Sequence, residues 1–72
     1  MIELIKQNLI LDKNSSEPMY QQLGAVICML AESGLIKPKD KLPPIRKLAE
    51  ALDINNITVV NAYKYLENKK IV

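Results

Sequence analysis

The stretch "DKLPPIRKLAEALDINNITVVNAYKYLE", residues 40–67, predicts two amphipathic helices separated by a short break. Pro43 and Pro44 open the first helix, because the missing N–H of proline has no partner in a first helical turn. The residues expected in the core follow the spacing i, i+3, i+4, i+7: Ile45, Leu48, Ala49 and Leu52. The stretch has no histidine, no paired nucleophile and no glycine-rich loop, so these helices are expected to present a surface and not to catalyse a reaction.

The break is "LDIN", and Asn55 at its end is expected to cap the second helix by accepting a hydrogen bond from the backbone N–H of Ile57 or Thr58. This helix is predicted to end near Asn68. One stripe along it is apolar and is expected in the core, namely Val59, Ala62, Tyr63 and Leu66. A second stripe lies roughly opposite and is expected to face outward, namely Ile57, Val60, Asn61 and Lys64.

The preceding part of the chain predicts one more helix, from Pro18 to Ser33, with Gly34 as its C-terminal cap. Apolar residues surround most of this helix, so it is expected to be buried on most sides. The segment between Gly34 and Pro43 is predicted to be a loop, because Pro38 and Pro43 prevent a helix there. Residues 9–18 form a short apolar stub followed by a polar turn. We therefore predict an N-terminal arm over residues 1–17 and one domain over residues 18–72.

The chain of 72 residues is long enough for one small domain, which buries only about 60% of its unfolded surface. Its longest clean apolar run, residues 25–31, is far shorter than the roughly 20 residues that cross a bilayer. The N-terminus lacks the cleavage site of a signal peptide, and the single cysteine, Cys28, cannot form an internal disulfide. These features predict a cytoplasmic protein with no membrane partner.

The charge is distributed unevenly along the chain. Residues 1–36 contain four acidic and two basic side chains, a net charge of −2, whereas residues 37–72 contain eight basic and four acidic side chains, a net charge of +4. A basic half can indicate a polyanionic partner, but a lysine-rich surface exposed only to solvent gives the same count. Charge alone leaves these two interpretations open.

Two helices joined by a short turn and carrying basic side chains also form the helix-turn-helix motif. In that motif one helix braces against the DNA backbone and the next lies in the major groove. The pattern by itself is a weak signal, because pairs of short amphipathic helices occur in many small domains.

Three segments make the assignment more specific: "EPMYQQL", "SGLIKPKDKLPPIRKLAEALDI" and "ITVVNAYKYLENKKIV". In this order and spacing they resemble the N-terminal winged-helix domain of the GntR family of bacterial transcription regulators, from about Pro18 to Val72. The resemblance implies a mostly α fold, a three-helix winged helix-turn-helix whose wing hairpin would begin at Val72 and is truncated. The residues "TVVNAYKYLE" are most similar to the MocR branch of the family, and the YtrA branch is a close second.

The branch bears on cofactors. MocR-like members continue into an aminotransferase-like domain that binds pyridoxal phosphate, whereas YtrA-like members carry a small helical effector domain. We expect no cofactor in this chain, and pyridoxal phosphate in the full-length protein only if it is MocR-like. The expected partners are double-stranded DNA, a second copy in a full-length homodimer, and a small-molecule effector on a C-terminal domain beyond this chain.

The resemblance also implies which residues contact DNA. Arg46 matches the family arginine that follows "LP", and residues 55–58 match the start of the recognition helix. The full set of expected contacts is Arg46, Lys47, Asn55, Asn56, Ile57, Thr58, Val60, Asn61 and Lys64. The capping role of Asn55 and a solvated Arg46 or Lys64 remain the alternatives for those residues.

The sequence departs from the family pattern at several positions. Lys39, Asp53 and Lys70 stand where members often have glycine, so these turns either take another form or hold modest strain. Asn56 stands where many members have arginine, and Ile57 where many have a polar residue.

Two other classes of function compete with DNA binding. Apolar Ile57 and Val60 on an outward helix face would suit a protein-interaction module built on the same fold. An enzymatic role finds no supporting set of residues in the chain, and it would require the pyridoxal-phosphate domain of a MocR-like protein.

Overall fold

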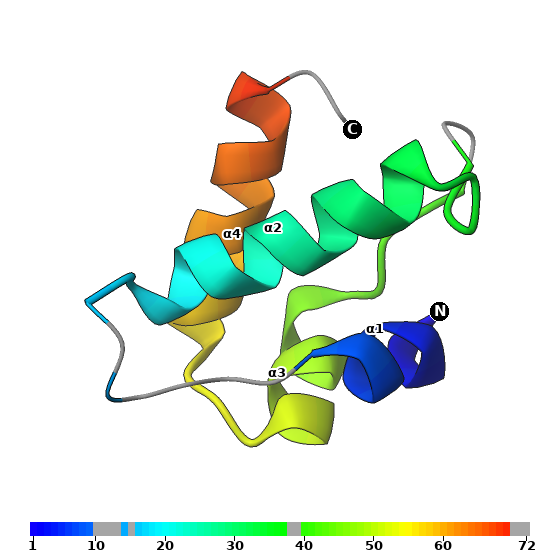
Figure 1. Cartoon of the computed structure of the whole chain (residues 1–72). Helices are drawn as coiled ribbons and strands as arrows, with labels where there is room; N and C mark the ends of the chain where they lie inside the picture. The colour runs from blue at the N-terminus through cyan, green and yellow to red at the C-terminus, as the bar shows by residue number, and fades with distance from the viewer. Residues whose placement is uncertain (10–13, 15, 38–39, 70–72) are drawn as a thin grey trace.

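The computed structural model describes residues 1–9, 14, 16–37 and 40–69. Within them the chain forms four helices and no strand: α1 (Ile2–Asn8), α2 (Met19–Glu32), α3 (Ile45–Leu52) and α4 (Asn56–Asn68). In Figure 1, α2 crosses in front of α4, and α1 and α3 lie together below this crossing. The predicted mostly α class is confirmed. The wing hairpin expected from Val72 onward lies outside the described residues.

One hydrophobic core joins all four helices. Its buried residues are Ile5, Leu23, Ile27, Leu30, Ile36, Leu48, Ala49, Val59, Ala62 and Leu66. The most extensive contact is between α2 and α4, followed by that between α3 and α4. The core stripe predicted for α4 is therefore confirmed at Val59, Ala62 and Leu66, and Tyr63 at its edge is half-buried.

Helix α1 was not predicted from the sequence. The segment 1–17, interpreted as an arm, contains this helix, and its Ile5 side chain is completely buried. Ile2 and Leu9 pack against the core as well, so the spacing 2, 5, 9 was the signal for a buried helix face. The domain boundary after residue 17 stays a prediction, but α1 shares the core of the helices that follow it.

The expectation that α2 is buried on most sides was wrong. Leu23, Ile27 and Leu30 are buried, but Ala25 is exposed and Met29 is 49% exposed. The physical reason is that, among the helices of the described residues, α2 packs against α4 and the short α1 only, and two neighbours cannot surround a helix.

The turns after α2 and α3 each place one residue in the left-handed region of φ. After α2, Gly34 has φ 85°, and the N–H groups of Gly34 and Leu35 donate to the carbonyls of Ala31 and Leu30. This pattern of hydrogen bonds is a Schellman motif, which confirms Gly34 as the C-terminal cap.

After α3, the same motif is built on Asp53, with φ 54° and ψ 50°. Its N–H donates to the carbonyl of Glu50 over 3.2 Å, and that of Ile54 donates to Ala49 over 3.0 Å. Aspartate is one of the few L-residues that enter this region readily, although it does so less favourably than glycine. The turn thus keeps the conformation that glycine would favour, with modest strain. The other two positions of this kind, Lys39 and Lys70, lie outside the described residues.

The substitution Leu48→Ala is expected to lower the free energy of unfolding by about 2–5 kcal/mol, because it deletes a completely buried side chain between α3 and its neighbours. Urea or thermal denaturation followed by circular dichroism measures the change. The matched control is Leu35→Ala, which removes the same atoms from a residue that is 60% exposed. Equal stability of the two variants would contradict this description of the core.

Candidate nucleic-acid interface

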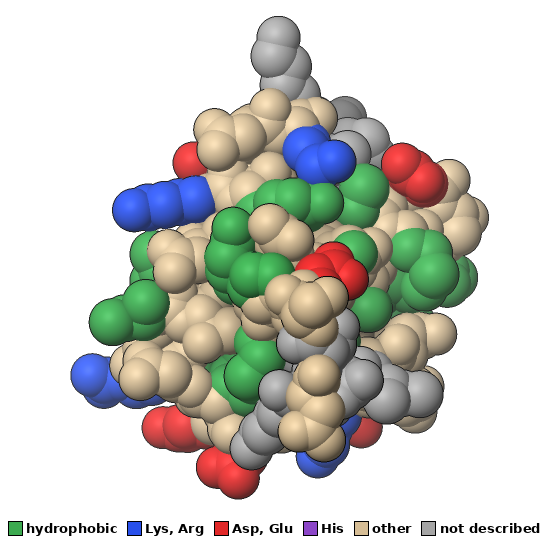
Figure 2. Space-filling model, turned by 60° about the vertical axis from the view of Figure 1, so that its left-hand side comes forward, with side chains coloured by type: hydrophobic (Ala, Val, Ile, Leu, Met, Phe, Trp, Pro, Cys, Tyr) green, Lys and Arg blue, Asp and Glu red, His purple; other side chains and the backbone are tan. Residues whose placement is uncertain are grey.

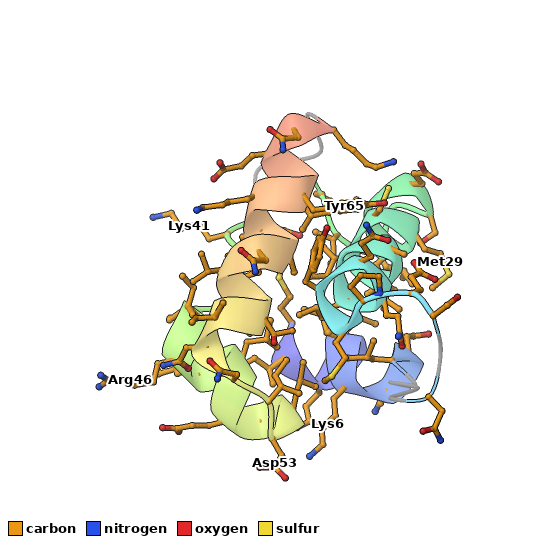
Figure 3. The ribbon with its side chains drawn as sticks, turned by 90° about the vertical axis from the view of Figure 1, so that its left-hand side faces the viewer. Lys6, Met29, Lys41, Arg46, Asp53 and Tyr65 are labelled. Atoms are coloured by element: carbon orange, nitrogen blue, oxygen red, sulfur yellow. The ribbon has the colours of Figure 1, made fainter. Side chains whose placement is uncertain are left out.

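Helix α4 has one face in the core and the opposite face in solvent. Because Val59, Ala62 and Leu66 point inward, Asn61 and Lys64 are exposed on the other side of the helix. Figure 3 views the molecule with α4 toward the reader, α3 on one side of it and α2 on the other. The outward stripe predicted from the sequence is therefore present, although Val60 within it is half-buried.

The first turn of α4 is held by a side-chain cap. Oδ1 of Asn55 accepts a hydrogen bond of 2.9 Å from the backbone N–H of Ile57, as predicted from the sequence. From Ile54 to Leu66 the chain has no acidic side chain. The partial positive charge of the helix N-terminus is therefore not cancelled by any acid on α4 before Glu67, an arrangement that favours a negatively charged partner.

The start of α3 is tied to the middle of α4 by one long-range hydrogen bond. The Tyr63 hydroxyl donates to the backbone carbonyl of Pro43 over 2.6 Å. Burial raises the pKa of Tyr63 to about 12, so the hydroxyl keeps its proton and its role as donor at neutral pH. This bond fixes the position of the first turn of α3, which carries Arg46, relative to the recognition-helix candidate α4.

Arg46 and Lys47 are both exposed in that first turn. In Figure 3 the Arg46 side chain extends away from the body of the molecule beside α4, and Lys41 extends on the same side. A flexible cationic side chain in this position can reach a phosphate or a base edge without any change in the core.

On its other side, α4 approaches α2 very closely. The Tyr65 ring lies against Gly24, where a Cβ atom would be only 2.5 Å from its Cδ1. Tyr20 meets the same ring edge-to-face with centroids 6.4 Å apart, and Nζ of Lys69 lies 5.0 Å from its centroid. Sequence reasoning placed Tyr65 off the core stripe and missed this contact. A glycine inside an apolar helix was the available signal.

The residues predicted to contact DNA thus come from two places, the first turn of α3 and the first half of α4. Those exposed are Arg46, Lys47, Asn55, Asn56, Ile57, Asn61 and Lys64, and those half-buried are Thr58 and Val60. Their individual roles stay predictions. Asn55 has a structural task as the helix cap whether or not it also lies near DNA.

The arrangement of α3 and α4, two helices joined by a tight turn with the second exposed along one face, is that of the helix-turn-helix motif. The family model described as "Bacterial regulatory proteins, gntR family" matches residues 19–72. The chain therefore belongs to the GntR family of bacterial regulatory proteins.

Individual relatives agree with this assignment. The chain is 42% identical over 62 residues to the HTH-type transcriptional repressor YtrA of Bacillus subtilis, covering 86% of this chain and 48% of that protein. It is 34% identical over 58 residues to the probable rhizopine catabolism regulatory protein MocR of Rhizobium meliloti, covering 81% of this chain and 12% of that protein. The sequence identity is thus higher to YtrA than to MocR, although the motif residues favoured the MocR branch.

A solved structure is similar as well. YtrA from Sulfolobus acidocaldarius, a GntR-family transcription factor, superposes with a TM-score of 0.81 at 42% identity, covering 86% of this chain and 66% of that chain. The chain spans about half the length of the Bacillus subtilis relative. No helix in the described part of the chain is both long and apolar enough to cross a membrane.

The substitution Arg46→Ala is expected to weaken binding to duplex DNA by about 1–3 kcal/mol, because it removes one cationic contact from the first turn of α3. Its unfolding curve should not change, because Arg46 is exposed. Fluorescence anisotropy with a labelled duplex measures the affinity. Lys6→Ala on α1 removes the same charge elsewhere and serves as the control. Equal losses in the two variants would mean that only net charge matters.

The substitution Tyr63→Phe is expected to cost about 1 kcal/mol of stability at pH 7, because it removes the hydrogen bond to Pro43. A tyrosine whose folded pKa lies above its unfolded value near 10 stabilises the fold fully below pH 10 and loses this contribution as pH rises toward 12. Denaturation between pH 7 and pH 11.5 should therefore show a smaller alkaline loss for Tyr63→Phe than for the wild type. Parallel pH profiles would contradict this linkage.

Proposed function

We propose that this chain binds duplex DNA with α4 in the major groove and the first turn of α3 beside the DNA backbone. The observation that carries the proposal is the geometry of α4, whose inner stripe is buried while its outer stripe is free of acidic side chains up to Leu66. A helix is about 10–12 Å across, which fits a major groove about 12 Å wide.

The side chains on this surface suit distinct parts of a duplex. Arg46 can bridge guanine O6 and N7 or hold a phosphate, and Lys47 can pair with a phosphate as a point charge. Asn56 follows the cap at the start of α4, and an asparagine there can pair with adenine N6 and N7. Asn61 and Lys64 lie further along the exposed stripe, where they can reach the flanking bases or the backbone.

The remaining expectations concern the full-length protein. We propose that it acts in the cytoplasm as a homodimer on a pseudo-palindromic site, with a small-molecule effector bound to a C-terminal domain. The solved and curated YtrA relatives support the branch with a small effector domain over the branch that binds pyridoxal phosphate. A single helix-turn-helix unit reads only one half-site, and operator specificity normally requires two half-sites about one helical turn or a multiple apart.

A second candidate function is docking to another protein through the outward face of α4. The observation that favours it is Ile57, which is 65% exposed. On the face shown in Figure 2, however, hydrophobic side chains reach the surface in several places that are interrupted by uncharged polar side chains and backbone. A stable docking site usually needs a larger continuous apolar area.

The test of DNA binding is its dependence on salt. Exposed Arg46, Lys47 and Lys64, with Lys37 or Lys41, offer three or four phosphate contacts. The logarithm of affinity should therefore fall with the logarithm of salt concentration with a slope of about −3 to −4. Binding of the 72-residue chain should be weak and should discriminate little between sequences. Titrations at several salt concentrations measure both quantities.

Joining two copies of the chain by a flexible linker should raise the affinity without any new contact, because the second half-site is then bound at a high effective concentration. A slope near zero, together with self-association that salt does not affect, would replace DNA binding by the protein-docking function. Nanomolar, sequence-specific binding by the single chain would contradict the proposed need for two half-sites.

A further inference from the structure

Ile57 is the most exposed large hydrophobic side chain in the described part of the chain. It is 65% exposed, compared with 60% for Leu35 and 49% for Met29. It also differs from these two in its place, because it lies in the first turn of α4, on the surface proposed to face the bases. In the part of the chain that the structure describes, Ile57 is not among the residues that pack on the core.

The direction of the Ile57 side chain is fixed by the cap. The backbone N–H of Ile57 itself donates to Oδ1 of Asn55 over 2.9 Å, and the backbone N–H of Thr58 donates to the carbonyl of Asn55 over 3.0 Å. The backbone of the first turn of α4 is therefore held in place at Ile57. A β-branched side chain also has fewer favourable χ1 rotamers than an unbranched one. Ile57 is thus an apolar side chain on a backbone that is held in a defined place.

The major-groove edges of the bases offer one apolar group, the C5-methyl of thymine. Every other group there is a hydrogen-bond donor or acceptor, apart from the C5–H of cytosine. An isoleucine has neither donor nor acceptor, so placing it against guanine or adenine removes water from polar atoms without replacing the hydrogen bonds. Against a thymine methyl it buries apolar surface on both sides.

We propose that Ile57 is a specificity-determining residue that contacts a thymine methyl, so that the half-site has an A·T pair at that position. The inference rests on the proposed function, because it requires α4 to lie in the major groove. Two neighbours fit the same kind of site. Asn56, the preceding residue, can pair with adenine, and half-buried Val60 continues the apolar surface one turn along the helix.

The test compares duplexes that differ only in the methyl group. An alternating A·T duplex presents a thymine methyl to any register of the protein, and replacing thymidine by deoxyuridine removes that methyl but keeps every hydrogen-bonding group. The wild-type chain is expected to bind the deoxyuridine duplex about fourfold more weakly, the worth of one buried methyl group. Ile57→Ala should show a clearly smaller difference between the two duplexes, because only an alanine methyl and half-buried Val60 remain on that surface.

A second pair of duplexes tests the same contact in the opposite direction. An alternating G·C duplex with 5-methylcytosine in place of cytosine presents a methyl group at the equivalent position of the groove. The wild-type chain should bind the methylated duplex more tightly than the unmethylated one, and this preference should be clearly smaller in Ile57→Ala. Leu35→Ala is the matched control, since Leu35 is similarly exposed but lies in the loop after α2.

Each outcome is decisive. Equal binding of thymidine and deoxyuridine duplexes by the wild-type chain overturns the inference, as does a preference that is undiminished in Ile57→Ala or disappears in Leu35→Ala. Loss of all DNA binding by the wild-type chain would instead overturn the proposed function. The Ile57→Ala variant should remain folded, because alanine is a better helix former and the side chain is exposed. The wild-type comparison decides the question without any variant.

Discussion

The close approach of α4 to α2 depends on the missing side chain at Gly24. The Tyr65 ring occupies the space in which any other residue would place its Cβ atom, 2.5 Å from Cδ1 of the ring. Glycine inside a helix costs about 1 kcal/mol relative to alanine, so this position disfavours α2 locally. This cost is offset by the close packing that Gly24 permits. The contact between α2 and α4 is the most extensive between any two helices of the described residues, and Tyr20 adds an edge-to-face aromatic contact with Tyr65.

The position of α4 then follows from three attachments in different directions. Its inner stripe enters the core at Val59, Ala62 and Leu66, Tyr65 packs on α2, and the Tyr63 hydroxyl holds the start of α3. These contacts leave only the side with Asn61 and Lys64 in solvent. The same three attachments therefore decide which side chains are free to meet a partner, and they place exposed Arg46 beside them.

The small size of the domain explains two features that would be unusual in a larger one. A chain this short has little core, and α1 contributes a completely buried residue, Ile5, to it. At the same time Met29 and the neighbouring face of α2 stay partly in solvent, because no further helix in the described part of the chain covers them. Relatives in the same family are about twice as long or longer, so the chain corresponds to the part of them that contains the helix-turn-helix.

The sequence by itself determined the three helices from residue 18 onward, the cap at Asn55 and the family. It marked Asp53 as a turn position where relatives often have glycine, but only the structure showed that this turn keeps the left-handed conformation. Each of these depends on local periodicity, on capping chemistry or on the order of short motifs, which act over a few residues. Residues 1–9 also carried a helical spacing, but the segment is too short for periodicity alone to distinguish a helix from an apolar arm.

Only the tertiary structure decided which faces are covered. The contact of Tyr65 with Gly24 and the hydrogen bond from Tyr63 to Pro43 each join residues that are 20 or more positions apart. The exposed side of α2 depends on how many neighbours that helix has. The periodicity of one segment contains no information about the distance to another. The outward direction of Ile57, by contrast, could be read from the helical wheel, but its exposure became certain only when α2 and α3 were seen to occupy the other sides of α4.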